Sequence, residues 1–353
     1  MATTTDDFLT GVIEGFYGRA WSFDTRLAYA GYLSEAGLNT CIYCPKGDLF
    51  LRSRWQEDWP AANWRELRQL SAAYRQCGLK WGVGLSPVEL YRHYGVAQRE
   101  ALRRKVGRLS ELDSPVMAIL FDDMPGDLDA LASRQAEIVA DVCDWLPEAL
   151  VLVCPTYYSF DPVLEQYFGT MPVNYWPQLG RELPPDVGVF WTGNKVCSES
   201  ISRGDIEGIV EQLARPVILW DNYPVNDGAV RSNFLFTSKL ADRSPALRPL
   251  LSGHLCNPMN QGLLSLPALS GLSELYGSGG LDDAALASIL GPATWDRLSR
   301  DRHVFQHLGL SGLGENRCRM LAAEYGRLPG PAASEVSQWL NGEYSFDPAC
   351  LTL

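Results

Sequence analysis

The sequence has 353 residues, of which 46% are hydrophobic and 20% are charged, with 32 glycines and 22 prolines. This composition is typical of a folded globular protein and excludes a collagen-like or low-complexity chain. The formal net charge of -12 disfavours a surface that binds nucleic acid or another polyanion.

Short strand-like runs alternate with longer helix-like patterns through most of the chain, which is typical of a parallel sheet built from strand–helix units. Strands are predicted at residues 12–17, 38–43, 79–85, 116–122, 149–154, 187–191, 216–220 and 251–256. Helices are predicted at residues 23–36, 64–77, 97–112, 128–145, 162–168, 199–213, 229–240 and 263–276. Gly37 and Gly78 follow the first two helices, where a helix-ending glycine is expected before a strand.

Eight such units without a break favour a closed TIM (β/α)8 barrel over a doubly wound open sheet. A dinucleotide-binding open sheet would carry G-x-G-x-x-G after its first strand, and Gly15-Phe-Tyr-Gly18 does not match that pattern. We therefore predict a catalytic barrel domain at residues 1–276 and a small helical C-terminal extension at residues 277–353. Helices are predicted in the extension at residues 282–290, 294–308 and 317–325.

The active site of a TIM barrel lies at the C-terminal ends of its strands. Polar or aromatic residues stand at or just beyond the predicted strand ends: Glu14-Gly15, Lys46, Ser86, Asp122-Asp123, Tyr157-Tyr158, Trp191-Thr192, Trp220-Asp221-Asn222 and Asn257. Segments far apart in the sequence thus bring polar groups to one rim. The sequence therefore predicts a functional pocket at this end of the barrel.

Two adjacent carboxylates, Asp122 and Asp123, end the apolar fourth strand. Carboxyl groups held together in a partly desolvated cleft can divide the work of proton donor and proton acceptor, as acid–base hydrolysis requires. A Mg²⁺ or Ca²⁺ site and a helix cap that involves Asp127 are the alternatives. The acidic residues lack calcium-loop spacing and the four histidines form no metal-binding motif, so we expect no metal and no cofactor.

A second polar group follows the seventh strand, where Trp220, Asn222 and Asp227 stand close together in the sequence. Sugars are bound by such a mixture, because their C–H faces stack on aromatic rings and their hydroxyls bond to amides and carboxylates. The alternative for Trp220 is an ordinary place in the core. The pattern favours carbohydrate chemistry.

Two further features bear on cellular location. No apolar run is long enough to span a bilayer, and residues 1–10 carry two aspartates and no signal-peptide pattern. Nine cysteines are scattered through apolar runs, and the C-x-x-C of Cys41 and Cys44 lacks the second pair or nearby histidine of a zinc site. We expect reduced cysteines and a cytoplasmic protein without a membrane partner.

The sequence resembles glycoside hydrolase family 84, the catalytic domain shared by protein O-GlcNAcases and bacterial β-N-acetylglucosaminidases. The matching stretches run in order: Gly11-Val-Ile-Glu-Gly-Phe-Tyr-Gly18, Asn39-Thr-Cys-Ile-Tyr-Cys-Pro-Lys46, Ile119-Leu-Phe-Asp-Asp-Met124, Cys154-Pro-Thr-Tyr-Tyr158, Trp191-Thr-Gly-Asn-Lys195, Trp220-Asp-Asn-Tyr-Pro-Val-Asn-Asp227, Arg243-Ser-Pro-Ala-Leu247 and Cys256-Asn-Pro258. The resemblance implies an exo-acting, retaining hydrolase that releases terminal β-linked GlcNAc. The 2-acetamido oxygen of the substrate would attack the anomeric carbon and form an oxazoline, an exception to the usual two-carboxylate scheme.

The resemblance also implies roles for particular residues. Asp122 would orient the acetamide N–H, Asp123 would act as acid and then as base, and the Tyr158 phenol would bond to the forming oxazoline. The implied substrate-binding residues are Gly15, Lys46, Trp220, Asn222, Asp227 and Asn257. The partner would be a GlcNAc-bearing glycoprotein or a small glycoside.

Gly47 and Gly228 depart from the family pattern, which usually has aspartate and an aromatic residue at these places. The natural aglycone and the oligomeric state therefore stay open. The alternatives to the leading hypothesis are a noncatalytic sugar-binding protein, an endo-acting glycosaminoglycan hydrolase and a metal-dependent hydrolase. A Schiff-base role for Lys46 is a further alternative, suggested by the fold alone.

Overall fold

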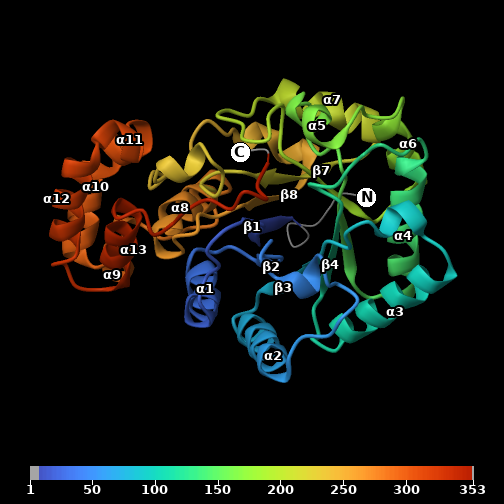
Figure 1. Ribbon diagram of the computed structural model, residues 1–353, viewed down its shortest axis with the longest axis horizontal. Helices are drawn as coiled ribbons and strands as arrows, with labels where there is room; N and C mark the ends of the chain where they lie inside the picture. Colours follow the sequence, from blue (N-terminus) through green and yellow to red (C-terminus); the bar gives the residue numbers. More distant parts are fainter. Residues whose placement is uncertain (1–7, 352–353) are drawn as a thin grey trace.

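The computed structural model describes residues 8–351. Eight parallel strands close into a barrel in which each strand pairs with the next and β8 pairs with β1 (Figure 1). The strands are β1 (Leu9–Glu14), β2 (Thr40–Tyr43), β3 (Lys80–Leu85), β4 (Val116–Leu120), β5 (Leu150–Cys154), β6 (Gly188–Trp191), β7 (Val217–Asp221) and β8 (Leu251–Cys256). The predicted TIM barrel is confirmed, with strand ends that differ by a few residues.

The strands are recognisable in the sequence because both of their faces are covered. Every residue of β1, β4 and β7 is buried, since the side chains alternate between the barrel interior and the surrounding helices. Continuous apolar runs such as Val116–Leu120 follow from this double burial. The core therefore fills the barrel and the layer between the barrel and the helices.

The helices that surround the barrel are α1 (Phe23–Glu35), α2 (Ala61–Gln76), α3 (Val96–Ser110), α4 (Leu131–Trp145), α5 (Val163–Phe168), α6 (Tyr175–Glu182), α7 (Arg203–Leu213) and α8 (Leu266–Leu275). Helix α6 was not predicted. Pro177 stands in the first turn, where a missing N–H costs nothing, and Gly180 allows the backbone to approach Leu213 on α7. Asp127 does not cap α4, which begins at Leu131, but pairs with Arg92 at 2.5 Å.

The helix predicted at residues 229–240 is wrong. Only a 3₁₀ turn forms there, at Arg231–Asn233, and a second 3₁₀ segment follows at Pro245–Leu250. The backbone between them bonds to the C-terminal helices, since Leu235 N donates to Phe305 O at 3.2 Å. Tertiary hydrogen bonds thus replace the helical ones.

The C-terminal helices lie together at one side of the barrel (Figure 1). They are α9 (Asp283–Leu290), α10 (Pro292–His307), α11 (Gly309–Leu313), α12 (Glu315–Tyr325) and α13 (Pro331–Leu340), so the helical extension contains α11 and α13 in addition to the predicted helices. Glu335 on α13 accepts hydrogen bonds from Leu263 N and Leu264 N, which ties the extension to the barrel. We propose residue 276, next to the end of α8, as the boundary between barrel and extension.

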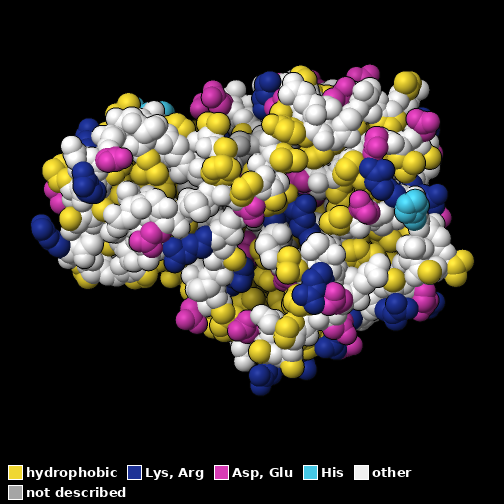
Figure 2. All heavy atoms as spheres, viewed as in Figure 1, with side chains coloured by type: hydrophobic (Ala, Val, Ile, Leu, Met, Phe, Trp, Pro, Cys, Tyr) yellow, Lys and Arg dark blue, Asp and Glu magenta, His cyan; other side chains and the backbone are white. Residues whose placement is uncertain are grey.

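The charged side chains of the described surface are distributed without a large patch of one sign on the face that is shown in Figure 2. Acidic and basic side chains are interspersed on the face that Figure 2 shows. Among residues 8–351, no helix has both the length and the apolar character that crossing a bilayer requires. Residues 1–7, which form most of the N-terminal segment used to predict the cellular location, lie outside the described residues.

Candidate active site

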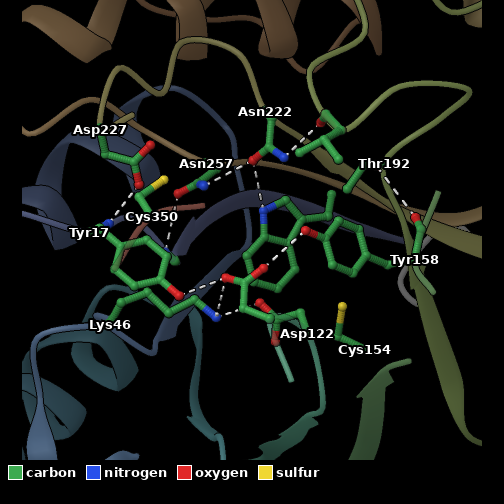
Figure 3. Close-up of a pocket in the computed structure, with 14 residues that line it drawn as sticks. Tyr17, Lys46, Asp122, Cys154, Tyr158, Thr192, Asn222, Asp227, Asn257 and Cys350 are labelled. Carbon is green, nitrogen blue, oxygen red and sulfur yellow. Dashed lines mark hydrogen bonds and ion pairs between the residues drawn. The ribbon is translucent and has the colours of Figure 1, made fainter. Parts of the chain in front are cut away.

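A pocket opens at the C-terminal ends of the strands, where the sequence predicts the functional site (Figure 3). The structure brings all of the predicted site residues to its wall: Gly15, Lys46, Asp122, Asp123, Tyr158, Trp220, Asn222, Asp227 and Asn257. Further lining residues are Tyr17, Cys154, Thr192, Val196 and Cys350. Segments from both ends of the chain thus converge on one small volume.

The two adjacent aspartates both face this pocket. Neighbouring residues of a regular strand point to opposite sides, but β4 ends at Leu120, before either aspartate. Asp123 then adopts a left-handed backbone with φ of 58°, a region that aspartate and asparagine tolerate better than most residues. This change of backbone direction allows two consecutive carboxylates to line one cavity.

Asp122 is paired with a buried lysine. Lys46 Nζ forms a direct ion pair and hydrogen bond with Asp122 Oδ2, and it lies 3.9 Å from Asp123 Oδ2. Burial opposes the charge on Lys46, but the carboxylates outweigh it and raise the pKa of the Lys46 ammonium above its ordinary value. A Schiff-base nucleophile must be deprotonated, so this environment argues against that role.

The second oxygen of the Asp122 carboxylate stands apart from this ion pair. Asp122 Oδ1 is buried and has no hydrogen-bond partner within residues 8–351. A buried carboxylate oxygen without a donor is costly, so it calls for a donor such as a ligand or a water molecule. Asp122 is therefore ready to accept a hydrogen bond from a donor in the pocket.

Asp123 is held by two phenols. Tyr17 Oη donates to Asp123 Oδ2 at 2.7 Å, and Tyr158 Oη donates to Asp123 Oδ1 at 3.1 Å. The Tyr17 hydroxyl in turn accepts a hydrogen bond of 2.6 Å from Arg52 Nη1. The orientation of the Asp123 carboxyl is thereby fixed from both sides, and Arg52 fixes one of the two groups that hold it.

Trp220 forms the apolar wall of the pocket. Its Nε1–H donates to Asn222 Oδ1 at 3.1 Å, and Asn257 Nδ2 donates to the same oxygen at 3.0 Å. Asn257 Oδ1 accepts from Gly15 N at 3.2 Å, so β1, β7 and β8 are linked across the pocket. A Cβ atom on Gly15 would lie 2.3 Å from the Trp220 ring, and only glycine permits this close packing.

Asp227 lines the same side of the pocket. Its Oδ2 accepts a hydrogen bond of 2.6 Å from Tyr17 N, while its Oδ1 is buried without a hydrogen-bond partner in the described part of the chain. Burial raises the pKa of Asp227 to about 6, although the hydrogen bonds from backbone N–H groups oppose the shift. Asp227 is a second carboxyl with an oxygen available to a ligand.

A buried ion pair supports the loops beneath the pocket. Arg243 bonds to both oxygens of Asp221, at 2.8 and 2.9 Å, and donates to the backbone oxygens of Ser198 and Glu199. His254 bonds to Asp221 Oδ2 at 3.0 Å. Burial alone would raise the pKa of Asp221, but Arg243 outweighs it and holds that pKa below its usual range. This network ties the loop after β6 to the end of β7.

The histidines and the cysteine pair considered above as metal ligands lie outside the pocket lining. His303 and His307 lie side by side on α10 in the extension, with tilted rings whose centroids are 4.6 Å apart. Among residues 8–351, no group of three or more histidine, cysteine, aspartate or glutamate side chains is arranged to hold a metal ion. Cys41 and Cys44 are buried, and burial raises the pKa of the Cys41 thiol to about 12.

Comparison with known families decides the class of this site. Residues 10–280 match the family model described as β-N-acetylglucosaminidase. The chain belongs to the β-N-acetylglucosaminidase family. The resemblance of its motifs to glycoside hydrolase family 84 is therefore confirmed.

Named relatives of this β-N-acetylglucosaminidase-family chain come from mammals and bacteria. Protein O-GlcNAcase of Rattus norvegicus and that of Mus musculus are each 31% identical over 280 residues, which cover 77% of this chain and 30% of theirs. The structure of an Asp-to-Asn mutant of Thermobaculum terrenum O-GlcNAc hydrolase is 26% identical, with a TM-score of 0.76. That match covers 95% of this chain and 81% of the bacterial one. The chain thus spans less than a third of the length of the mammalian relatives.

Sequence reasoning missed several residues in and around the pocket. Tyr17 stands inside the Gly15-Phe-Tyr-Gly18 motif, and its place two residues after Gly15 is the signal that could have identified it. Thr192 was noted only as a strand-end residue, and its N–H donates to Tyr158 O at 3.0 Å. Arg52 and Cys350 carry no sequence signal, because only the folded chain brings them to the site.

Proposed function

We propose that the chain is an exo-acting, retaining β-N-acetylglucosaminidase in which the acetamido group of the substrate is the nucleophile. The observation that carries this proposal is the division of the carboxylates: Asp122 keeps a buried, unpartnered oxygen, whereas Asp123 is clamped by two phenols. A reaction in which one carboxyl orients an N–H and the other moves a proton needs this asymmetry.

In the first step, Asp122 Oδ1 accepts a hydrogen bond from the acetamide N–H. The polarised acetamide oxygen attacks the anomeric carbon as the bond to the leaving oxygen breaks, and Asp123 gives its proton to that oxygen. Lys46 holds the Asp122 carboxylate in place through their ion pair, and that carboxylate stabilises the positive charge that develops on the acetamide nitrogen. The product of this step is a protonated oxazoline, whose N–H stays hydrogen-bonded to Asp122.

In the second step, Asp123 removes a proton from water, which attacks the anomeric carbon and opens the oxazoline. Attack from the face opposite to the acetamide oxygen restores the β configuration. Tyr158 Oη, which is hydrogen-bonded to Asp123, is the phenol that can donate a hydrogen bond to the developing oxazoline. The two displacements together give net retention without a covalent enzyme adduct.

The far wall of the pocket suits the hydroxyl groups of a terminal sugar. Asp227 Oδ1 is an available acceptor, and Asn257 and the Gly15 backbone lie beside it in the lining. Asn222 holds Trp220, Asn257 and the Val196 carbonyl in place, so it positions this wall as well as lining it. An aromatic ring and neighbouring polar groups together bind a pyranose by both faces and edges.

We propose terminal β-linked GlcNAc as the substrate group, on a glycoprotein or on a small glycoside. The names of the rat, mouse and Thermobaculum terrenum relatives point to O-GlcNAc as the modification that those proteins remove. The net charge of -12 agrees with a neutral sugar and opposes a polyanionic chain as substrate.

The replacement Asp123→Asn tests this division of labour. Asparagine tolerates the left-handed backbone at this position, so the fold should persist. We expect kcat to fall by about 10²–10⁴-fold for glycosides with poor leaving groups, which need a proton, and by much less for 4-methylumbelliferyl or nitrophenyl glycosides. Asp127→Asn, at an exposed aspartate of the same loop, is the matched control and should leave both rates unchanged. Equal losses on good and poor leaving groups would show that Asp123 is not the acid.

A further inference from the structure

The chain returns to the catalytic pocket after α13. Residues 341–351, here called the C-terminal strap, leave the helical extension and cross toward the barrel mouth (Figure 1). Cys350 in the strap lines the pocket and is only 6% exposed (Figure 3). A residue from the extension thus shares the pocket with Tyr17 and Asp227, and the proposed reaction gives it no role.

A turn in the strap presents Cys350. Cys350 N donates to Asp347 O at 2.9 Å, and Ala349 N donates to the Asp347 side chain at 2.9 Å. Aspartate at the first position and proline at the second favour such a β-turn, and Pro348 stands at the second. Local sequence therefore shapes the strap tip independently of the pocket that receives it.

The strap contacts the barrel at the surface and also through Tyr344, which is partly buried against the core. Glu343 approaches Arg19 at 4.0 Å, with both side chains about half exposed, and Arg19 also lies over the Tyr344 ring. Phe346 and Leu351, which flank the tip, are 43% and 49% exposed. An exposed ion pair contributes little, so this pair offers little resistance when the strap leaves the pocket.

The free volume beside Cys350 indicates whether the strap and a sugar can occupy the pocket together. With the strap in place the pocket has a free volume of about 30 Å³, enough for about two water molecules. A pyranose with its acetamido group needs several times that space. Lys46, Asp122 and Trp220 are anchored by the ion pair and hydrogen bonds within the barrel, whereas the strap is not part of the barrel.

We propose that the C-terminal strap is a displaceable plug that competes with the substrate for the catalytic pocket, with Cys350 as its inserted tip. The inference rests on the proposed function, since the pocket in question is the GlcNAc site. Substrate binds only to the fraction of molecules whose strap is displaced, so the apparent Kd equals the intrinsic Kd divided by that fraction. It sets access to the pocket and takes no part in bond making or breaking.

Shortening the strap tests the competition. A variant that ends at Gly342 keeps α13, and Cys350→Gly removes only the inserted side chain. If the open state is about 10% populated, both variants should lower KM for 4-methylumbelliferyl N-acetyl-β-D-glucosaminide by up to about tenfold, with kcat unchanged. The matched control is Leu351→Ala, which alters an exposed neighbour of the tip and should leave KM unchanged. An unchanged or higher KM in the shortened variant would overturn the proposal, because the strap would then be a fixed wall of the sugar site.

Thiol reactivity in the full chain gives a second, independent readout. Displacement by a sugar exposes Cys350, so N-acetylglucosamine should accelerate its alkylation by iodoacetamide, measured by peptide mass mapping. Cys77 and Cys143, which are partly buried away from the pocket, serve as internal references and should react at the same rate with or without the sugar. Protection of Cys350 by the sugar would contradict the plug. If neither full nor shortened chain binds or cleaves a GlcNAc glycoside, the proposed function fails, whereas activity with an unchanged KM refutes the plug alone.

Discussion

The close packing of Gly15 on Trp220 gives a prediction whose size follows from the coordinates. A Cβ atom on Gly15 would lie 2.3 Å from Trp220 Cζ2 and 2.8 Å from Cη2. Carbon atoms rest at about 3.5–4.0 Å, so the replacement Gly15→Ala must push the ring edge by more than about 1 Å. The backbone of Gly15 is not in the left-handed region, so the steric contact is the main perturbation.

A displaced Trp220 reshapes the wall of the sugar site. Misplacement of a positioning group by about 1 Å can cost about 10²-fold in rate, which corresponds to about 2.7 kcal/mol of transition-state stabilisation. Movement of the ring also strains its 3.1 Å hydrogen bond to Asn222. Overpacking of this kind lowers the free energy of unfolding by about 1–3 kcal/mol. We expect a fall of about 10²-fold in kcat/KM together with a modest fall in Tm.

The assay is kcat/KM on 4-methylumbelliferyl N-acetyl-β-D-glucosaminide, with Tm measured on the same samples. Gly47→Ala is the matched control, because a Cβ atom there meets nothing within 4 Å although the residue adjoins Lys46. The smaller ring of Trp220→Phe should relieve the contact, so the double replacement with Gly15→Ala should lose less activity than the two single losses added together. Wild-type kcat/KM in a folded Gly15→Ala protein would refute the packing argument.

Three further predictions concern charged groups. Arg52→Met removes the donor to the Tyr17 hydroxyl, so kcat should fall by about tenfold and the pH profile of kcat should change shape. Arg52→Lys should recover part of the activity, and an unchanged pH profile would mean that Arg52 does not act through Asp123. KM should rise as pH falls through about 6, where the Asp227 carboxylate gains its proton, and Asp227→Asn should abolish that rise. Because the pKa of Asp227 is higher in the folded than in the unfolded protein, this group also lowers the free energy of unfolding as pH rises from about 4 to about 6. Arg243→Met leaves Asp221 buried without its partner and should lower the free energy of unfolding by about 3–5 kcal/mol in chemical denaturation, and a loss below about 1 kcal/mol would contradict a structural role for the pair.

Much of the barrel could be predicted because each strand is buried on both sides and therefore stands out as an apolar run. The end of such a run marks the rim where the loops converge, so Asp122, Trp220 and Asn257 could be assigned to one pocket from the sequence alone. This assignment is possible because parallel strands place all of their carboxyl ends on the same rim of the barrel.

The parts that were missed depend on contacts between distant segments. Residues 229–240 contain a pattern that suits a helix, but their backbone bonds to α10 and the Asn233 side chain accepts a hydrogen bond from Ser311 N on α11 instead. Cys350 reaches the pocket from a segment that follows the whole extension, and no local pattern indicates where that segment ends up. Propensity and periodicity describe neighbours in the sequence and cannot report such long-range partners.

The central claim is that the acetamido group of the substrate does the nucleophilic work under the control of Asp122. The most direct measurement is the rate of fluorophore release from 4-methylumbelliferyl N-acetyl-β-D-glucosaminide beside the plain β-glucoside, in the presence of EDTA. We predict that only the acetamido substrate is cleaved, and that Asp122→Asn reduces this rate by about 10²–10³-fold. Comparable rates on the two glycosides, or an Asp122→Asn protein as active as wild type, would contradict the account.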